Sequence, residues 1–494
     1  MLLEINTVNF LYKLSQKYKK LIKIKDVPLE EWEKLSYNST VKYIWLMGIW
    51  KRSKLSKKIS LQNIKQYYPI MEKIEEKYIL GSAYSIIDYI PNPSIGTFKD
   101  LLKVKKILNN MGIKLIVDFV PNHMALDNVY VDKNIFIEVS FEEFAQNPEL
   151  FYILEKKGKS RYLAFGKDPF FPPWTDTLQI NIFSKEAQKI LLENLKKISR
   201  YADGVRVDMA MLLLKDIFYN NWKKYLKIPD ISQFEEFWGI ATKSTDLIFI
   251  AECYWNTENK LLNLGFHYTY DKRFLDSIVN QNIQEMKYLI SLNPEFQKRM
   301  LRFLENHDEE RIANKLNDYN SEAILTLFFT TLGLKMVYYE QFEGQTVKIP
   351  VQLLSVKDNY KPVPIYEKFI QIYKRISPFL EKGKFTIFKV NPVFDESYKN
   401  LLAYGYILDF LFLIVVVNFS SSYSQGIINI NESYPSHSFK TIKNINSKLD
   451  VNLKLDVNLK LNDLITGEKY YRDLTRLHII LPPYKSHIFL FQED

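Results

Sequence analysis

One short segment of the sequence places a carboxylate next to a guanidinium at the end of an apolar run. The segment is Gly204-Val-Arg-Val-Asp208. Side chains alternate along a strand, so Arg206 and Asp208 share one face. A neighbouring guanidinium keeps a carboxylate ionised, and an ionised, fixed aspartate is suited to nucleophilic attack. A buried Arg–Asp pair with a purely structural role explains the same pattern equally well.

A glutamate ends a second apolar run, Leu247-Ile-Phe-Ile-Ala-Glu252. Desolvation at the end of so apolar a strand should raise the pKa of Glu252. A glutamate that holds its proton near neutral pH can act as a general acid. An isolated glutamate at a strand end is more often simply solvated. Glu252 is therefore a catalytic candidate only in combination with the other acids at strand ends.

Two further acidic residues also end or follow an apolar run. Asp118 opens the segment Asp118-Phe-Val-Pro-Asn-His123, and Asp308 closes Phe303-Leu-Glu-Asn-His-Asp308. Two of the six histidines therefore stand in Asn-His pairs past strand ends. Acids on neighbouring strand ends form the glycosidase pattern, in which one carboxylate is the nucleophile and another is acid and then base. A separation of about 5–5.5 Å between the working pair would mean retention of configuration.

The elements that would position these acids are short apolar runs alternating with helical patterns. Thr97 and Ser184 are suited to cap two of the helices, and Gly112 is suited to follow the end of the first. Repeated strand–helix–strand units imply a parallel sheet, and about eight of them suggest a (β/α)₈ barrel. The predicted strands are 41–47, 114–120, 204–207, 247–251, 300–304 and 335–339, with 2–5 as a weaker one.

Two stretches do not fit the barrel pattern. The long connection after residue 120 is rich in aromatic residues and proline, which is typical of a small inserted domain. Beyond residue 378, the runs 385–390, 401–408, 411–418 and 478–491 read as strands without helices, so we expect an all-β sandwich. The predicted domains are a catalytic barrel (1–121 and 186–380), an inserted domain (122–185) and a C-terminal β-sandwich (381–494). A hexapeptide repeated over 449–460 reads as a tolerated hairpin duplication.

Composition excludes several classes of protein. The net charge of the 494 residues is 67 − 57 = +10, but the lysines are spread thinly, which favours a solvated surface over nucleic-acid binding. The longest apolar run, 410–417, is too short to cross a membrane. The single Cys253 excludes an intramolecular disulfide. With no apolar leader at the start, these features predict a cytoplasmic protein.

The four strand-end segments resemble the signature blocks of the α-amylase superfamily (glycoside hydrolase family 13). Residues 118–123 resemble its Asp-x-Val-x-Asn-His block, 204–208 its Gly-Phe-Arg-x-Asp block, and 303–308 its Phe-x-x-Asn-His-Asp block. Glu252 ends a segment similar to the strand 5 block. The order and spacing also match, so the resemblance covers nearly the whole chain.

The resemblance implies a role for each of these residues. Asp208 would be the nucleophile, Glu252 the acid/base and Asp308 the third acid, which grips sugar hydroxyls. Arg206 would steady Asp208. The implied sugar-binding residues are His123, His307, Tyr84 and, nearby, Asp88, the last two because 83–89 is similar to the family's Gly-Tyr-x-x-x-Asp-Tyr. Core packing remains an alternative for Tyr84.

Some positions depart from the family pattern. Met211 and Leu212 replace a Lys-His pair of many starch-cleaving members, and Lys335 and Glu340 replace a proline and a glycine. The position of Asn122 is a calcium ligand in many relatives. The inserted stretch offers no clear acidic partners, so the sequence leaves calcium open, and it implies no other cofactor.

The resemblance implies a retaining hydrolase that cleaves α-1,4-glucosidic bonds in intracellular α-glucans or maltooligosaccharides. Glucan transfer, in which an acceptor sugar replaces water, uses the same three acids and is the alternative. A non-catalytic carbohydrate-binding relative is less favoured because all three acids are present. The sequence does not fix substrate length, the endo or exo mode, or the oligomeric state.

Overall fold

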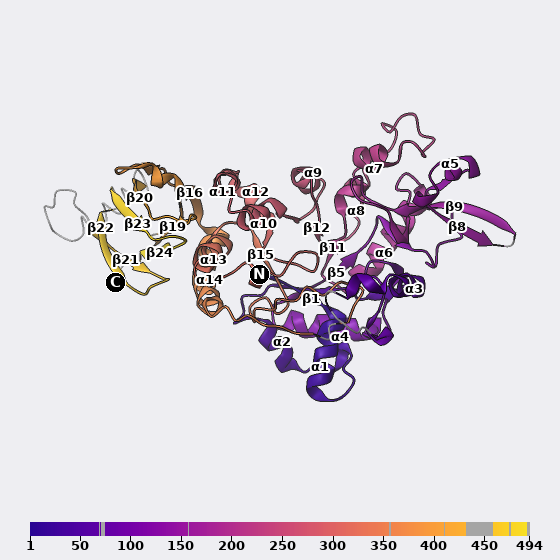
Figure 1. Cartoon of the computed structure of the whole chain (residues 1–494), viewed down its shortest axis with the longest axis horizontal. Helices are drawn as coiled ribbons and strands as arrows, with labels where there is room; N and C mark the ends of the chain where they lie inside the picture. The colour runs from indigo at the N-terminus through magenta and orange to yellow at the C-terminus, as the bar shows by residue number, and fades with distance from the viewer. Residues whose placement is uncertain are drawn as a thin grey trace.

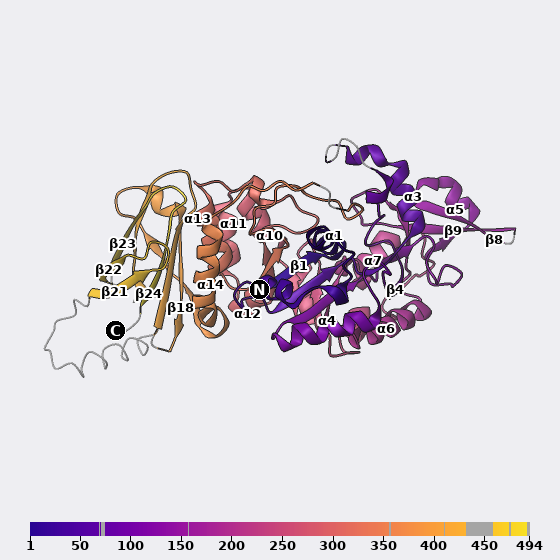
Figure 2. The ribbon, with the colours of Figure 1, turned by 90° about the horizontal axis from the view of Figure 1, so that it is seen from below.

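The computed structural model of the chain describes residues 1–68, 70, 75–156, 158–354, 357–409, 411–430, 458–473 and 476–491. The molecule is elongated, with a barrel in the middle (Figure 1). The long connection after residue 120 forms an antiparallel sheet at one end of the molecule, and the C-terminal sheets lie at the other end. A second view shows the same order of parts (Figure 2).

Eight parallel strands close the barrel, so the predicted (β/α)₈ fold with a C-terminal sheet domain is confirmed. Around the barrel they are β1 (Leu2–Asn6), β15 (Leu334–Tyr338), β14 (Met300–Phe303), β13 (Tyr268–Tyr270), β12 (Ile248–Ala251), β11 (Gly204–Val207), β5 (Lys114–Phe119) and β2 (Tyr43–Met47). Apolar side chains such as Trp45, Ile116 and Leu301 fill its interior. Strand β13 has no counterpart among the predicted strands.

Helices surround the barrel, and two begin where their capping residues predict. Thr97 accepts a hydrogen bond from the backbone N–H of Asp100 at the start of α4, and Gly112, just past the end of α4, has a φ of +75°. Ser184 caps α6 in the same way. The helices around the barrel are α1 (Thr7–Tyr18), α2 (Leu29–Leu35), α3 (Lys54–Gln62), α4 (Phe98–Asn110), α6 (Lys185–Ser199), α7 (Lys215–Trp222), α8 (Phe237–Ala241), α9 (Glu258–Asn263), α10 (Lys272–Val279), α11 (Ile283–Ser291), α12 (Pro294–Lys298), α13 (Ser321–Thr330) and α14 (Ile365–Lys382).

The long connection after β5 folds into an antiparallel sheet of its own. Its strands lie in the order β6 (His123–Ala125), β10 (Trp174–Gln179), β9 (Lys159–Gly166) and β7 (Glu138–Val139), with β8 (Phe151–Lys156) also paired to β9. Helix α5 (Phe141–Gln146) lies between β7 and β8 in the chain. Another small hairpin, β3 (Trp50–Arg52) with β4 (Ile86–Pro91), lies at the barrel mouth. The residue boundaries drawn above for the three domains stay a prediction.

The C-terminal part forms two antiparallel sheets. The larger has the order β16 (Lys384–Ile387), β18 (Leu401–Leu408), β19 (Leu411–Asn418), β24 (Ser486–Phe491), β21 (Asn458–Asp463) and β22 (Lys469–Asp473). The smaller contains β17 (Val390–Asn391), β20 (Ser424–Ile428) and β23 (Leu477–Leu481). Most of the hexapeptide duplication, at 449–457, lies outside the described residues.

Two predicted C-terminal strands are wrong, because each is split between the two sheets. The run 478–491 divides into β23 and β24, since Pro482 and Pro483 carry no N–H for a ladder and Tyr484 has a left-handed φ of 54°. The run 385–390 likewise leaves the larger sheet after a last hydrogen bond from the Phe388 N–H to the Ala403 carbonyl, and Val390 joins the smaller sheet.

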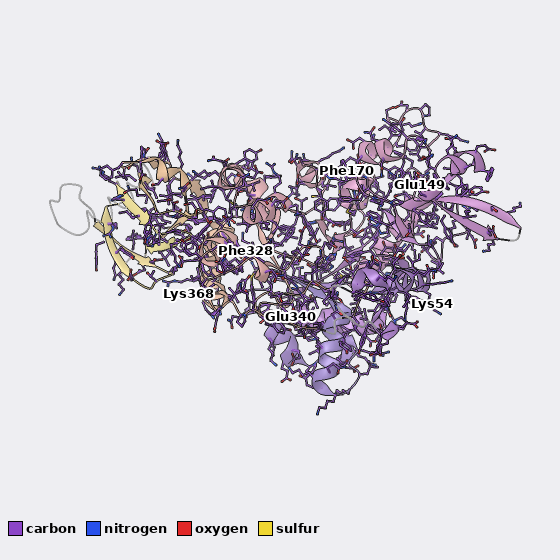
Figure 3. All side chains as sticks on the ribbon, in the orientation of Figure 1. Lys54, Glu149, Phe170, Phe328, Glu340 and Lys368 are labelled. Carbon is purple, nitrogen blue, oxygen red and sulfur yellow. The ribbon has the colours of Figure 1, made fainter. Side chains whose placement is uncertain are left out.

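Helix α13 joins the barrel to the larger C-terminal sheet. All of its residues are buried, because β18 and β19 cover the side that the barrel leaves free; Phe328 lies at this junction (Figure 3). Within the described ranges, no helix has the length and apolar composition needed to cross a membrane.

Candidate active site

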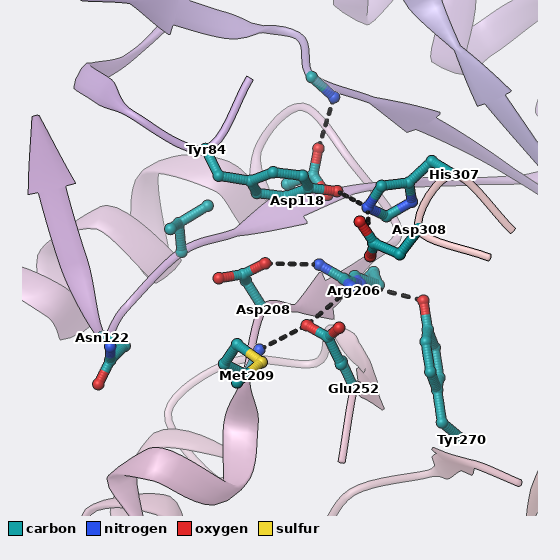
Figure 4. A network of polar contacts seen from close by, with 12 residues as sticks. Tyr84, Asp118, Asn122, Arg206, Asp208, Met209, Glu252, Tyr270, His307 and Asp308 are labelled. Atoms are coloured by element: carbon teal, nitrogen blue, oxygen red, sulfur yellow. Dashed lines mark hydrogen bonds and ion pairs between the residues drawn. The ribbon is translucent and has the colours of Figure 1, made fainter. Parts of the chain in front are cut away.

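The carboxyl ends of the barrel strands surround one hollow of about 1080 Å³. Asp208 follows β11, Glu252 follows β12 and Asp308 follows β14, and all three line it. Tyr84 and His123 also line the hollow. The close-up shows the three acids turned toward one another around Arg206 (Figure 4). The structure therefore brings the predicted acids of three separate segments to one place.

Arg206 is the centre of this cluster. Its Nη1 donates to Asp208 Oδ1 at 2.8 Å, and its Nη2 forms an ion pair with Glu252 Oε2 at 2.8 Å. Its Nε donates to the Tyr270 hydroxyl at 3.1 Å. The guanidinium is also 4.9 Å from the centre of the Trp45 ring. Its exposed fraction is only 1%, so this cation is buried between the two carboxylates.

Glu252 is held at both carboxylate oxygens. The backbone N–H of Met209 donates to Oε2 at 2.7 Å, and the Tyr254 hydroxyl donates to Oε1 at 3.0 Å. Met209 adopts a left-handed φ of 45°, which is uncommon for a residue with a side chain. Burial raises the pKa of Glu252 to about 7, against the opposing charge of Arg206. The expectation of a raised pKa for this glutamate agrees with the structure.

Asp208 differs from the simple expectation that its arginine partner sets its charge. Burial raises the pKa of Asp208 above its usual value, Arg206 lowers it, and the nearby Asp308 raises it further. His123 Nε2 lies 4.0 Å from Asp208 Oδ2. Burial lowers the pKa of His123 to about 4, so this ring is neutral at pH 7. The pKa of Asp208 is thus lowered first by Arg206 and, more weakly, by the charge of His307.

His307 links the third acid, which follows β14, to β1, the next strand but one around the barrel. Its Nε2 is 2.9 Å from Asp308 Oδ2 and 3.0 Å from the Tyr84 hydroxyl, and its Nδ1 is 2.5 Å from Glu4 Oε1. Burial opposes a charge on the ring, but the carboxylates of Asp308 and Glu4 raise the pKa of His307 well above its ordinary value. In turn, although burial raises it, the imidazolium and Arg206 lower the pKa of Asp308.

Three predicted residues take other places. Asp118 is buried beneath the hollow, where its carboxylate accepts from the Trp45 indole N–H at 3.1 Å and from the backbone N–H of Gly48 at 2.6 Å. Asp88 is not among the residues lining the hollow, and its carboxylate accepts from the N–H of Tyr89. Asn122 stands apart from the acids, at the end of its segment (Figure 4).

The residues around Asn122 do not fit calcium. Its Oδ1 accepts a hydrogen bond from the Gln179 side-chain amide at 3.0 Å, so a neutral donor occupies that oxygen. In the part of the chain that the structure describes, no three His, Cys, Asp or Glu side chains are grouped to hold a metal ion. Calcium binding needs several oxygen ligands, with carboxylates among them in most sites.

Glu4 and Tyr254 are among the residues of the cluster that escaped the sequence analysis. Glu4 is fully buried in β1, and its signal was a charged residue inside the apolar run Leu2-Leu-Glu-Ile5. Such a residue must find a buried partner. Tyr254 comes two residues after Glu252, a spacing that returns its side chain toward the same face of an extended segment. Cys253, which lies between Glu252 and Tyr254 in the sequence, is fully buried, and burial raises the pKa of its thiol.

Comparison with known proteins finds chains that are similar in sequence and in fold. No family model matches the chain. The chain is 23% identical over 339 residues to Alpha-amylase 2 of Dictyoglomus thermophilum, which covers 64% of the chain and 55% of that relative. It is 22% identical over 373 residues to a cyclomaltodextrin glucanotransferase of Bacillus licheniformis, covering 71% of the chain and 49% of that relative. These matches span about half the length of the curated relatives.

Solved structures show the same fold along the full chain. A maltogenic α-amylase from Thermotoga neapolitana superposes with a TM-score of 0.64 at 17% identity, covering 100% of this chain and 99% of that one. An α-amylase from Lactobacillus plantarum gives 0.63 at 17% identity, covering 100% and 98%. The chain is thus similar in sequence to α-amylases and cyclomaltodextrin glucanotransferases, and it shares the fold of solved α-amylases.

Proposed function

We propose that the chain is a retaining glycoside hydrolase that cleaves α-1,4-glucosidic bonds in α-glucans or maltodextrins. The observation that carries the proposal is Arg206, which contacts Asp208 and Glu252 at the same time and so makes the two carboxylates close neighbours. A close pair is the arrangement of retaining enzymes, since an inverting pair stands further apart to admit a water. The intracellular setting of the substrate rests on the sequence expectation alone.

Each acid has one task in this mechanism. An Asp208 oxygen attacks the anomeric carbon and forms an ester bond to the sugar, while the bond from that carbon to the leaving oxygen breaks. Glu252 gives its proton to that oxygen, and a pKa of about 7 lets it hold the proton at neutral pH. Glu252 then takes a proton from water, whose oxygen attacks the same carbon and frees Asp208. Two inversions give net retention.

The remaining residues hold the sugar ring. Asp308 is half exposed to the hollow and ionised beside His307, so it is suited to accept hydrogen bonds from sugar hydroxyls. Tyr84 lies flat against His307, with ring centres 5.4 Å apart. Its position on the wall of the hollow is suited to stacking on a sugar face. Asp308 therefore binds the sugar ring by hydrogen bonds and forms no covalent bond to it.

Glucan transfer is a second candidate, favoured by the rim of the hollow. The exposed rings of Phe171 and Trp255 line it, with exposed fractions of 70% and 39%. Such rings are platforms on which an acceptor sugar can stack in place of water. One of the similar proteins is a glucanotransferase by name. Transfer would need no change in the three acids.

Incubation with maltoheptaose tests both candidates. We expect shorter products whose new reducing ends first appear as the α-anomer in proton NMR; β-anomers would contradict a retaining mechanism. Products longer than maltoheptaose would assign the chain to transfer instead of hydrolysis.

Variants separate the catalytic assignment from general damage to the cleft. Asp208→Asn and Glu252→Gln should each lower kcat by about 10²–10⁴-fold or more. Asp276→Asn is the matched control, because Asp276 lines the same hollow but contacts Lys272 on the rim. Full activity of Asp208→Asn would end the proposal.

A further inference from the structure

A buried side-chain amide lies among three oxygen atoms where the inserted sheet meets the barrel. Gln179 has an exposed fraction of 0%. Its Nε2 donates to the backbone carbonyl of Asn122 at 2.9 Å, to Asn122 Oδ1 at 3.0 Å and to the carbonyl of Ile180 at 3.1 Å. One nitrogen with two hydrogens thus serves three acceptors, and Asn122 is itself only 1% exposed.

This contact fastens two parts of the fold together. Gln179 ends β10 and pairs with His123 of β6 across the inserted sheet. Asn122 belongs to the segment that leaves barrel strand β5, and its carbonyl also accepts from the N–H of Ile180 at 3.0 Å. His123, the next residue, carries its ring to the hollow beside Asp208. The amide therefore fixes the start of the segment that carries His123 into the hollow.

Two backbone carbonyls and an amide oxygen around one buried point are the ligand types that hard cations such as Ca²⁺ take from proteins. A cation there would also need negative charge, and none of the groups contacting the Gln179 amide is a carboxylate. The amide N–H groups supply the positive end of a dipole instead, and so give each of these buried oxygens a hydrogen-bond donor.

We propose that the Gln179 amide stands in the place of a cation, so that this chain fastens its inserted sheet without calcium and carries a latent cation site that a single carboxylate would open. This inference does not depend on which reaction the site catalyses. It makes opposite predictions for the native chain and for a carboxylate variant.

The native chain is tested first, by thermal unfolding in EDTA and in millimolar CaCl₂. We expect the same Tm in both, because no carboxylate at the Gln179 amide supplies the negative charge that binds Ca²⁺. A Tm that falls in EDTA and recovers with CaCl₂ in the native chain would overturn the proposal. So would a stoichiometric Ca²⁺ binding isotherm that is lost in Asn122→Leu.

The carboxylate variant is Gln179→Asp, whose shorter side chain leaves room for an ion between it and the three oxygens. In EDTA its carboxylate offers no donor to those three oxygens, so we expect a lower Tm than that of the native chain. CaCl₂ should raise the Tm saturably, and titration calorimetry should show one site with a Kd in the range of about 10⁻⁶–10⁻³ M.

Gln179→Leu is the control, because it removes the amide and offers no ligand. Its Tm should fall to a similar extent and should not respond to CaCl₂. If Gln179→Asp does not fold in EDTA, refolding it with and without CaCl₂ gives the same reading, and Gln179→Glu provides a carboxylate of the native length. If neither carboxylate variant responds to CaCl₂, the three oxygens do not form a cation site and the proposal is wrong.

Discussion

Glu252 carries the clearest electrostatic signature at the scale of single residues. It is 3% exposed and held by Met209 and Tyr254, and burial raises its pKa to about 7. A general acid must carry its proton when the bond breaks. We therefore expect kcat/KM for a maltooligosaccharide to fall as pH rises through about 7.

The pH profile can be tied to Glu252 by changing the leaving group. Maltosyl fluoride needs no proton on its leaving group, so the fall in its glycosylation rate above pH 7 should disappear. Tyr254→Phe gives a second check. It removes a hydrogen bond to the carboxylate, which should raise the pKa of Glu252 and move the alkaline limb to higher pH. An unmoved limb in both experiments would assign it to another group.

Glu4 gives a second prediction, because it supplies half of the negative charge around His307. Glu4→Gln keeps the shape but removes that charge, so the pKa of His307 should fall and that of Asp308 should rise. We expect kcat/KM to fall about tenfold, as for the loss of about 1.4 kcal/mol, and its acid limb to move to higher pH. A pH–rate profile of the variant measures both effects.

Glu305→Gln is the matched control for Glu4. Glu305 is equally buried but pairs with Arg311, away from the hollow. A merely destabilising effect of losing a buried charge would appear in both variants. A shifted acid limb should appear only in Glu4→Gln.

The sequence could predict most of the acids at the hollow but not the partners that tune them. Asp208 and Glu252 end apolar runs and Asp308 follows one, and strand ends of a parallel barrel meet at one mouth. Glu4 lies 303 residues from its partner His307, so only the closed barrel brings them together. The sequence leaves calcium at Asn122 open because the inserted stretch offers no clear acidic partners. The hydrogen-bond partner of Asn122, Gln179, is fixed by sheet register that local patterns do not give.

At the scale of elements, strand β15 buries an ammonium group. Lys335 is 0% exposed, lies beside Arg302 in register, and donates to the carbonyls of Thr331 and Leu332 at 2.6 and 3.0 Å. Burial, then the charge of Arg302, lowers the pKa of Lys335 well below its ordinary value. The folded state therefore favours the neutral form of the Lys335 side chain.

Lys335→Met should remove a pH dependence of stability. Between the lowered folded pKa and the ordinary value near 10.5, the unfolded chain binds the proton that the folded chain has lost. The native free energy of unfolding therefore rises with pH relative to that of the variant, by about 1.4 kcal/mol per pH unit at most. Urea unfolding of both proteins at pH 7, 8 and 9 measures the difference, and parallel pH curves would contradict the prediction.

Prediction from sequence was weakest where strands are short or interrupted. Strand β13 is only Tyr268–Tyr270, too short for a periodic signal, and it is defined by its parallel neighbours. The run 478–491 looked continuous by composition, although Pro482 and Pro483 send its halves into different sheets. Long elements with a cap, such as α4, were located almost to the residue.

At the scale of the whole molecule, the barrel and the larger C-terminal sheet share one core. Leu402 and Leu413 of that sheet lie in the same buried cluster as Phe328 of α13. The Tyr404 hydroxyl is 2.6 Å from Thr330 Oγ1, and the Tyr406 hydroxyl donates to the Thr330 carbonyl at 2.7 Å. Since α13 is buried all round, it needs the sheet as much as the barrel.

We therefore expect the barrel and this sheet to unfold together. Tyr404→Phe and Tyr406→Phe should each lower the free energy of unfolding by about 1 kcal/mol, and urea should still give one transition. Both near-UV circular dichroism and loss of activity should report that transition. Tyr471→Phe, on the exposed edge strand β22, is the control and should leave the midpoint unchanged.

The sharper form of this test ends the chain after Gly383. Removing the sheet uncovers the apolar side of α13 and leaves the Thr330 carbonyl without the Tyr406 hydroxyl. Exposed apolar surface of this kind favours aggregation, so the shortened chain should be recovered mainly as insoluble protein. A soluble shortened chain with the native Tm and full activity on maltoheptaose would show that the barrel core closes without the sheet, which the burial of α13 on every side argues against.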